Sequence, residues 1–76
     1  MNQNKDLEER DLMIEAFEKF NHVLTNNQKQ VMHLYYIEDL SLAEIAEILA
    51  TSRSNVFDTL SKARKKIIPF LDLIKN

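Results

Sequence analysis

Hydroxyl, cationic and aromatic side chains are concentrated between residues 52 and 66, where they are well suited to contact a nucleic acid. Serine hydroxyls can donate hydrogen bonds to phosphate oxygens, and lysine and arginine can neutralise phosphate charge. The sequence predicts nucleic-acid contacts from ten residues of this segment: Ser52, Arg53, Ser54, Phe57, Asp58, Ser61, Lys62, Arg64, Lys65 and Lys66.

Arg53 and Ser54 stand at the start of an expected helix, the part of a recognition helix that reaches deepest into a DNA groove. We therefore predict that they contact base edges or phosphates. The alternative is an ion pair between Arg53 and a nearby carboxylate such as Glu44 or Glu47. The cations that follow are predicted to contact the phosphate backbone, or otherwise to form a solvated helix face: Lys62, Arg64, Lys65 and Lys66.

Phe57 and Asp58 are unusual residues for such a helix. Phe57 could contact a thymine methyl or a base step, although an exposed aromatic of this kind more often packs against a protein partner. The carboxylate of Asp58 would repel phosphates and lower affinity, unless it accepts a hydrogen bond from a cytosine amine.

The charge distribution supports contact with phosphates, although the whole chain has a net charge of −2. Residues 1–50 carry four basic and ten acidic side chains, a net charge of −6, whereas residues 51–76 carry six basic and two acidic ones, a net of +4. Positive charge is therefore gathered on the segment that a DNA-binding helix would present.

Other kinds of site are not expected. His22 and His33 stand eleven residues apart on different expected helices, without a carboxylate at ligand spacing, so we expect no metal site. The chain has no cysteine and no visible nucleophile–base pair or phosphate loop, so we expect neither enzymatic activity nor a cofactor. No apolar run approaches the ~20 residues that span a bilayer, so we expect a cytoplasmic protein without membrane contact.

The elements that must position these residues are helices of one all-α domain spanning residues 1–76, with residues 1–5 flexible. The chain has no glycine, which argues against strand-rich folds with tight turns. The first helix is predicted over 6–22, where apolar residues at helical spacing include Met13, Phe17, Phe20 and Leu24. A second helix should begin after Thr25, whose spacing from Gln28 fits a capping box. We expect its apolar face to be Val31, Leu34 and Tyr35, flanked by Met32 and Tyr36.

A helix-turn-helix is predicted over about residues 41–67, as two capped helices joined by a short turn. Ser41 and Glu44 have capping-box spacing, and Ile45, Ile48 and Leu49 should face the core, with Ala46 allowing a close helix crossing. Residues 50–52 form the turn, and Ser52 can cap the second of these helices. Its apolar stripe at helical spacing consists of Val56, Leu60, Ala63 and Ile67.

Pro69 either ends this helix or begins a short last one, because proline lacks an N–H and clashes with the preceding turn. Four apolar side chains follow it: Phe70, Leu71, Leu73 and Ile74. In so small a domain they must fold back on the core or bury against a second chain. We expect a homodimer through this segment in preference to a self-covered monomer.

The stretch from Thr25 to Ile67 resembles region 4 of bacterial sigma factors, and more closely the YlxM family of small sigma-region-4-like proteins. The resemblance is carried by Leu34-Tyr35-Tyr36, Asp39-Leu40-Ser41-Leu42, Glu44-Ile45-Ala46-Glu47, Ser52-Arg53 and Val56-Phe57-Asp58. The chain departs from the family in three ways. Ala50 stands at a turn where glycine or an acidic residue is usual. The C-terminal part is shorter than in the family and is broken by Pro69, and we recognise no resemblance in about the first ten residues.

The resemblance implies an all-α DNA-binding protein with a regulatory role linked to the signal recognition particle pathway, because members are typically encoded beside its genes. The alternative is a protein-interaction module on the same scaffold, which binds RNA polymerase, a component of the signal recognition particle or its RNA. Asp58 and the net charge of −6 over residues 1–50 fit this alternative better.

Overall fold

The computed structural model describes the backbone of residues 2–75 and the side chains of residues 9–74, and within this range it contains helices and turns without strands. The all-α fold class is therefore confirmed. The elements in chain order are α1 (Asn2–Phe20), the 3₁₀ turn η1 (Asn21–Val23), α2 (Asn26–Met32), the π-helical turn η2 (His33–Ile37), α3 (Leu42–Ile48), α4 (Arg53–Ile67), the 3₁₀ turn η3 (Ile68–Phe70) and α5 (Leu71–Lys75).

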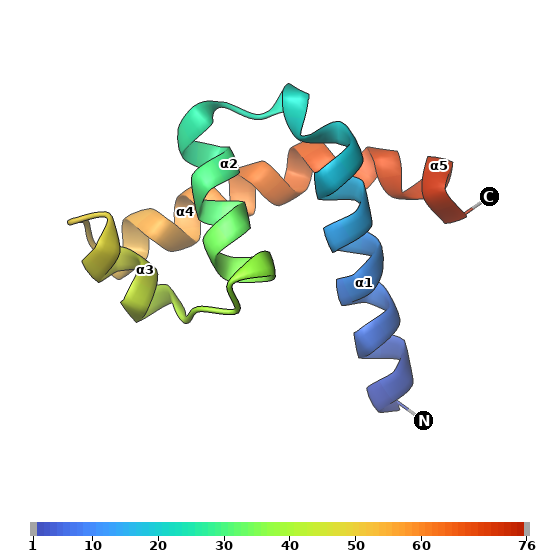
Figure 1. Ribbon diagram of the computed structural model, residues 1–76, viewed down its shortest axis with the longest axis horizontal. Coiled ribbons are helices and arrows are strands. Elements are labelled where there is room, and N and C mark those ends of the chain that lie inside the picture. Colours follow the sequence, from blue (N-terminus) through green and yellow to red (C-terminus); the bar gives the residue numbers. More distant parts are fainter. Residues whose placement is uncertain (1, 76) are drawn as a thin grey trace.

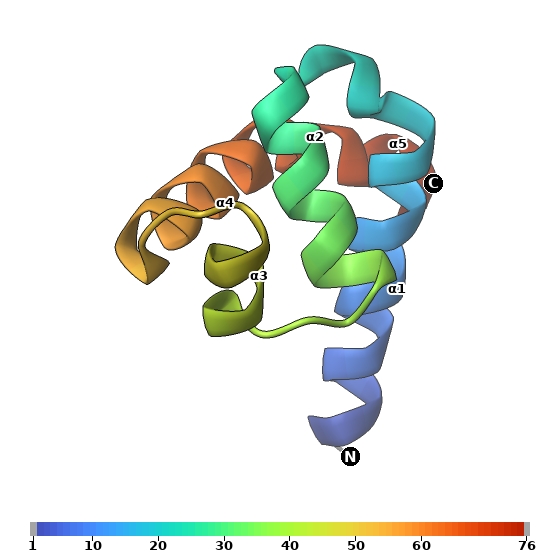
Figure 2. The same ribbon diagram turned by 60° about the vertical axis from the view of Figure 1, so that its left-hand side comes forward.

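The long helix α4 is the centre of the arrangement (Figure 1). Its first half packs against α3 and α2, and its second half leads to α1 and α5, which contact each other. Figure 2 shows α2 and α3 lying along one side of α4, with the α3–α4 pair forming the helix-turn-helix. This pair presents one side of α4 away from the rest of the molecule.

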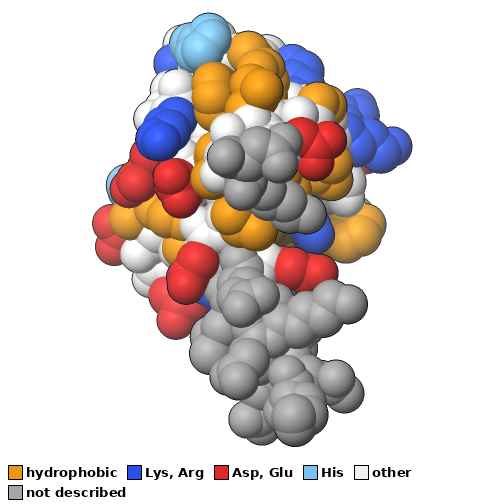
Figure 3. All heavy atoms as spheres, turned by 90° about the vertical axis from the view of Figure 1, so that its right-hand side faces the viewer, with side chains coloured by type: hydrophobic (Ala, Val, Ile, Leu, Met, Phe, Trp, Pro, Cys, Tyr) orange, Lys and Arg blue, Asp and Glu red, His pale blue; other side chains and the backbone are white. Residues whose placement is uncertain are grey.

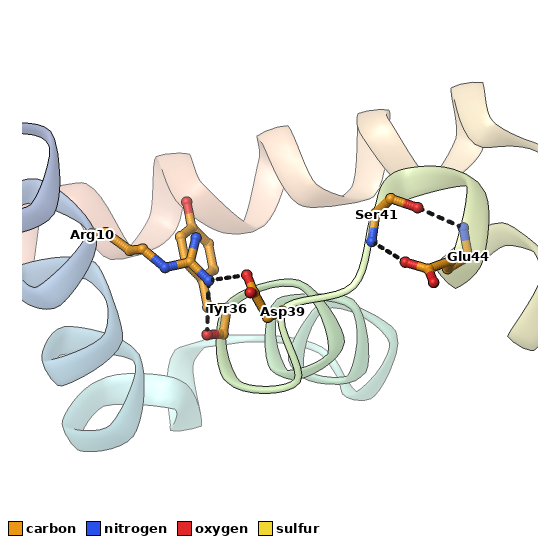
Figure 4. A network of polar contacts seen from close by, with 5 residues as sticks. All are labelled: Arg10, Tyr36, Asp39, Ser41 and Glu44. Carbon is orange, nitrogen blue, oxygen red and sulfur yellow. Dashed lines mark hydrogen bonds and ion pairs between the residues drawn. The ribbon is translucent and has the colours of Figure 1, made fainter. Parts of the chain in front are cut away.

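Two capping boxes fix where α2 and α3 begin, as predicted. The Thr25 hydroxyl accepts a hydrogen bond from the Gln28 N–H at 3.1 Å, and the Thr25 N–H donates to the Gln28 side chain at 3.0 Å. Ser41 and Glu44 make the same pair of bonds at 3.1 and 2.8 Å (Figure 4). Hydrogen bonds from the Ser41 N–H and hydroxyl lower the pKa of Glu44, because they stabilise its carboxylate.

The core is built around the predicted stripe of α4, all of which is buried: Val56, Leu60, Ala63 and Ile67. The other elements contribute the rest of the buried set: Met13, Ala16, Phe17, Leu24, Val31, Met32, Tyr36, Ile45 and Ala46. Ala46 is buried and α3 packs on α4, as expected for a small residue between these two helices.

The N-terminal boundaries differ from those predicted. α1 begins at Asn2, four residues before the predicted start, and ends at Phe20, while Met1 is outside the described residues. Leu24 is buried but belongs to the loop after η1, where its N–H donates to the Asn21 carbonyl at 2.9 Å. Leu24 therefore reaches the core from the loop before the Thr25 cap, not as part of the face of α1.

The predicted apolar face of the second helix is wrong in part, because the helix widens into the π-turn η2. The Glu38 N–H bonds to the carbonyl of His33, five residues earlier, at 3.1 Å. The wider turn rotates the following side chains relative to an α-helix. As a result Tyr36 is buried with Val31, whereas Leu34 and Tyr35 are only half-buried.

Ile48 was predicted to face the core, but 58% of its surface is exposed. Ile45 and Ala46 form the buried edge of α3, and Ile48 lies two residues beyond Ala46, about 200° around the helix from it at 100° per residue. The helix therefore turns Ile48 outward.

The turn of the helix-turn-helix is a Schellman motif with alanine in the position that usually holds glycine. Ala50 has a positive φ of 54°, its N–H donates to the Glu47 carbonyl at 3.2 Å, and the Thr51 N–H donates to the Ala46 carbonyl at 2.9 Å. The left-handed conformation is costly for residues with a Cβ atom, so the turn is held by its hydrogen bonds and by the packing of α3 on α4.

We expect Ala50→Gly to raise the free energy of unfolding by about 0.5–1 kcal/mol, because the relief of left-handed strain exceeds the entropy that glycine adds to the unfolded chain. Ala43→Gly is the matched control, since Ala43 is an exposed residue inside α3. It should lower stability by about 1 kcal/mol. Urea denaturation measures the free energy of unfolding of both variants. A lower value for Ala50→Gly than for the wild type would show that the backbone of Ala50 is not strained.

The C-terminal segment folds back on the chain. α4 ends at Ile67, and Pro69 stands in η3, so the proline redirects the backbone into α5. The ring of Phe70 stacks on Phe20 with the ring centroids 4.5 Å apart. Leu71 and Ile74 pack against the core, whereas Leu73 remains 66% exposed. Three of the four apolar side chains after Pro69 therefore contact their own chain, and the expected homodimer stays a prediction that rests on the exposed Leu73.

Candidate nucleic-acid interface

The start of α4 is positioned by the turn before it. The Ser52 hydroxyl accepts a hydrogen bond from the Asn55 N–H at 3.1 Å, as the sequence predicted, and the Asn55 side chain donates to the Thr51 hydroxyl at 2.8 Å. Ser52 thus serves first as a helix cap. These bonds tie the first turn of α4 to the turn that precedes it.

The outward face of α4 is the surface opposite its buried stripe. It holds residues about one turn apart that are exposed or half-buried: Ser54, Asp58, Ser61, Lys62 and Lys65. Six of the ten predicted contact residues, these five together with Phe57 at the edge of the face, therefore lie on one side of one helix. Such a convex, exposed helix has the dimensions to enter a major groove.

Arg53 and Ser54 are both exposed at the first turn of α4, next to Phe57. These three residues and Leu42 of α3 line an open hollow on the surface. Among the ion pairs of the described residues none involves Arg53, so the alternative pairing with Glu44 or Glu47 is not formed. The guanidinium at the start of α4 is thus available to an external acceptor.

The carboxylate of Asp58 pairs with Lys62 one helical turn later, with 3.1 Å between Oδ2 and Nζ. Both side chains are more than half exposed, so the pair contributes little to stability. It does place a positive charge beside the carboxylate that would otherwise meet a phosphate alone. Lys62 compensates part of the repulsion that the sequence predicted for Asp58.

The four cations at the end of α4 point in different directions. Lys62 and Lys65 lie on the outward face, whereas the Lys66 ammonium donates to the Gln28 side chain of α2 at 3.0 Å. Arg64 lies on the flank of α4 opposite Lys66, where it lines a groove with Arg10 and residues of η2. The structure therefore does not bring the four cations together into one cluster.

A polar network that the sequence did not reveal joins α1 to the end of η2 (Figure 4). Arg10 donates to the Asp39 carboxylate at 2.9 Å and to the Tyr36 carbonyl at 3.2 Å, and its guanidinium lies 5.4 Å from the centre of the Tyr36 ring. Asp39 has a positive φ of 61°, which suits aspartate better than most residues. Burial raises the pKa of Tyr36, and the positive charge of Arg64 opposes the rise.

The network fixes the loop that leads into α3. Arg10 and Asp39 stand 29 residues apart, and no periodicity or motif connects positions at such a distance. The only local signal is the preference of aspartate for turns and left-handed backbone.

The histidines occupy separate surface positions. His33 pairs with Glu38 at 3.3 Å between Nε2 and Oε2, while His22 is exposed beside Phe20. No three metal-ligating side chains converge in the described part of the chain. No helix over residues 2–75 has the length and apolarity to cross a membrane.

Comparison with known proteins agrees with this geometry. Residues 7–74 match the model of the UPF0122 family, described as "Putative helix-turn-helix protein, YlxM / p13 like". A UPF0122 protein of Clostridium perfringens (strain SM101 / Type A) is 47% identical over 53 residues, which cover 70% of this chain and 47% of that protein. One of Clostridium kluyveri (strain NBRC 12016) is 38% identical over 66 residues, or 87% of this chain and 60% of the relative.

A third relative, from Clostridium novyi (strain NT), is 41% identical over 51 residues, which cover 67% of this chain and 44% of its own length. The matched part of this chain thus spans about half the length of these curated relatives. No solved structure matches the chain significantly. With a family match that includes both helices of the helix-turn-helix, this chain belongs to the UPF0122 family of YlxM/p13-like helix-turn-helix proteins.

Proposed function

We propose that this protein binds double-stranded DNA through the first turn and the outward face of α4 and regulates transcription by doing so. The observation that carries the proposal is the exposed first turn of α4, where the Arg53 side chain has no ion-pair partner among the described residues. Lys62 and Lys65 continue the positive charge along the same helix. No cofactor is needed for such binding.

In this mechanism the first turn of α4 enters the major groove, with Arg53 and Ser54 near base edges. Lys62 and Lys65 neutralise phosphates and set the register of the helix in the groove. Arg64 and Lys66 lie on opposite flanks of α4, so each would reach a different strand. One such module binds weakly, and a second copy on a neighbouring half-site would raise affinity and specificity.

A regulator of this kind would act in the bacterial cytoplasm. A link to the signal recognition particle pathway remains part of the proposal and rests on the resemblance to the YlxM family. The relatives extend beyond the matched region, so partners of the longer proteins are not transferred to this chain.

A protein-interaction module is the second candidate, and the other end of the molecule favours it. Figure 3 shows hydrophobic side chains gathered on the face where α1 and α5 lie. Leu73 of α5 is 66% exposed there, and Phe20 and Phe70 are half-buried. RNA polymerase or a component of the signal recognition particle would be bound on this face, leaving α4 free.

Titration of a fluorescent duplex of about 20 base pairs, between about 50 and 200 mM salt, tests the proposal. The wild-type affinity should fall steeply with salt. The double variant Lys62→Gln, Lys65→Gln should bind more weakly to every sequence, and the slope of log K against log salt should shrink by about two.

Asp58→Asn is the matched control on the same face, because it removes a negative charge where the lysine variant removes positive ones. It removes the carboxylate without changing its shape, and it frees Lys62, so affinity should rise by up to about fivefold, equivalent to about 1 kcal/mol. Tighter binding to an RNA duplex, or a slope that the lysine variant leaves unchanged, would contradict the proposed interface.

A further inference from the structure

Phe57 is an apolar side chain on an otherwise polar face. Its ring is 60% exposed, and it stands one residue before Asp58 and one helical turn after Arg53. Leu42, the first residue of α3, lies across the hollow that Phe57, Arg53 and Ser54 also line. Two helices thus bring two apolar side chains to the edge of the surface proposed to meet DNA.

We propose that the hollow between Leu42 and Phe57 receives the 5-methyl group of a thymine in the major groove, so that the protein prefers thymine-containing DNA. This inference rests on the proposed function. The thymine methyl is the apolar group that base pairs present in the major groove, and aromatic or aliphatic side chains contact it. Uracil lacks this methyl group, and the major groove of duplex RNA is too deep and narrow for side chains to read.

Charge complementarity selects DNA as the occupant of this hollow. Arg53 lines the hollow together with Phe57 and pairs with no described carboxylate, while Lys62 and Lys65 stand farther along the helix. An anionic ligand with an exposed methyl group satisfies both the cations and the ring. The spacing of Arg53 and Phe57, about 6 Å along the helix axis, is about two base steps of 3.4 Å.

The test compares two DNA duplexes of equal length, one of alternating A–T and one in which deoxyuridine replaces every thymidine (A–U). They differ only in one methyl group per base pair. Burial of one methyl group changes a binding constant by about fourfold, so the wild type should bind the A–T duplex about fourfold more tightly. Phe57→Ala should bind both duplexes equally, with the affinity that the wild type has for A–U. Leu73→Ala, which shortens an exposed apolar side chain on α5, should keep the wild-type ratio.

A second pair of duplexes separates the methyl group from the shape of A–T sequences. Two alternating G–C duplexes are compared, one with cytosine and one with 5-methylcytosine. Only 5-methylcytosine carries a methyl group at C5, the ring position that bears the methyl group of thymine, and the wild type should again prefer the methylated duplex. Thermal melting of Phe57→Ala should match the wild type, because the exposed ring supports no core contact.

The outcomes distinguish this inference from the proposed function. Salt-dependent binding with equal affinity for thymine and uracil duplexes would overturn the thymine contact alone and leave Phe57 to a protein partner. If Phe57→Ala still prefers the A–T duplex over the A–U duplex, the preference reflects duplex shape, and this result would also overturn the thymine contact. Failure to bind any duplex at low salt would contradict both.

Discussion

Ile45→Ala should lower the free energy of unfolding by about 3 kcal/mol, within the range of 2–5 kcal/mol for buried isoleucine. Ile45 is fully buried where α3 packs on α4, so its truncation removes apolar contacts and leaves a cavity. A domain of this size has only about 5–15 kcal/mol of stability, so the loss is a large share of the total.

Ile48→Ala is the control that isolates burial. Ile48 belongs to the same short helix, three residues later, and 58% of its side chain is exposed. Both substitutions change helix propensity by the same amount, so Ile48→Ala should change stability by less than about 0.5 kcal/mol. Urea denaturation followed by circular dichroism gives both values, and equal losses would show that α3 is rotated relative to the structure.

The sequence predicted what short-range chemistry decides. A capping box needs two residues three positions apart, so both boxes could be predicted from neighbours in the sequence alone. The stripe of α4 was also predictable, since a helix of 15 residues repeats its buried face often enough to define it. Of the candidate site, the same reasoning predicted the helix and the position of Ser54 and Asp58 away from its buried stripe.

Features that depend on contacts between distant residues were not predictable. α3 is seven residues long, which is too short for its apolar spacing to show whether Ile48 or Ala46 meets α4. The direction of Lys66 depends on where Gln28 of α2 lies, and the bond between Arg10 and Asp39 depends on the π-turn. A run of cations in the sequence therefore predicts that the helix is positively charged. It does not predict that the side chains lie on the same face.

Phe70→Ala should lower the free energy of unfolding by about 2 kcal/mol, because the half-buried ring loses apolar contact and its stack on Phe20. Leu73→Ala is the matched control in the same segment, and its exposed side chain should contribute less than about 0.5 kcal/mol. Thermal or urea denaturation of the two variants therefore measures how much the C-terminal segment stabilises its own chain.

Light scattering over a concentration series measures whether the C-terminal segment also joins two copies of the chain. Since Phe70, Leu71 and Ile74 already pack within the chain, the protein should remain monomeric up to high micromolar concentration without DNA. A mass that doubles with concentration and returns to the monomer value in Leu73→Ala would instead place a dimer interface on α5. In that case the exposed face of α1 and α5 would pair two copies, and the two outward faces of α4 would bind neighbouring half-sites together.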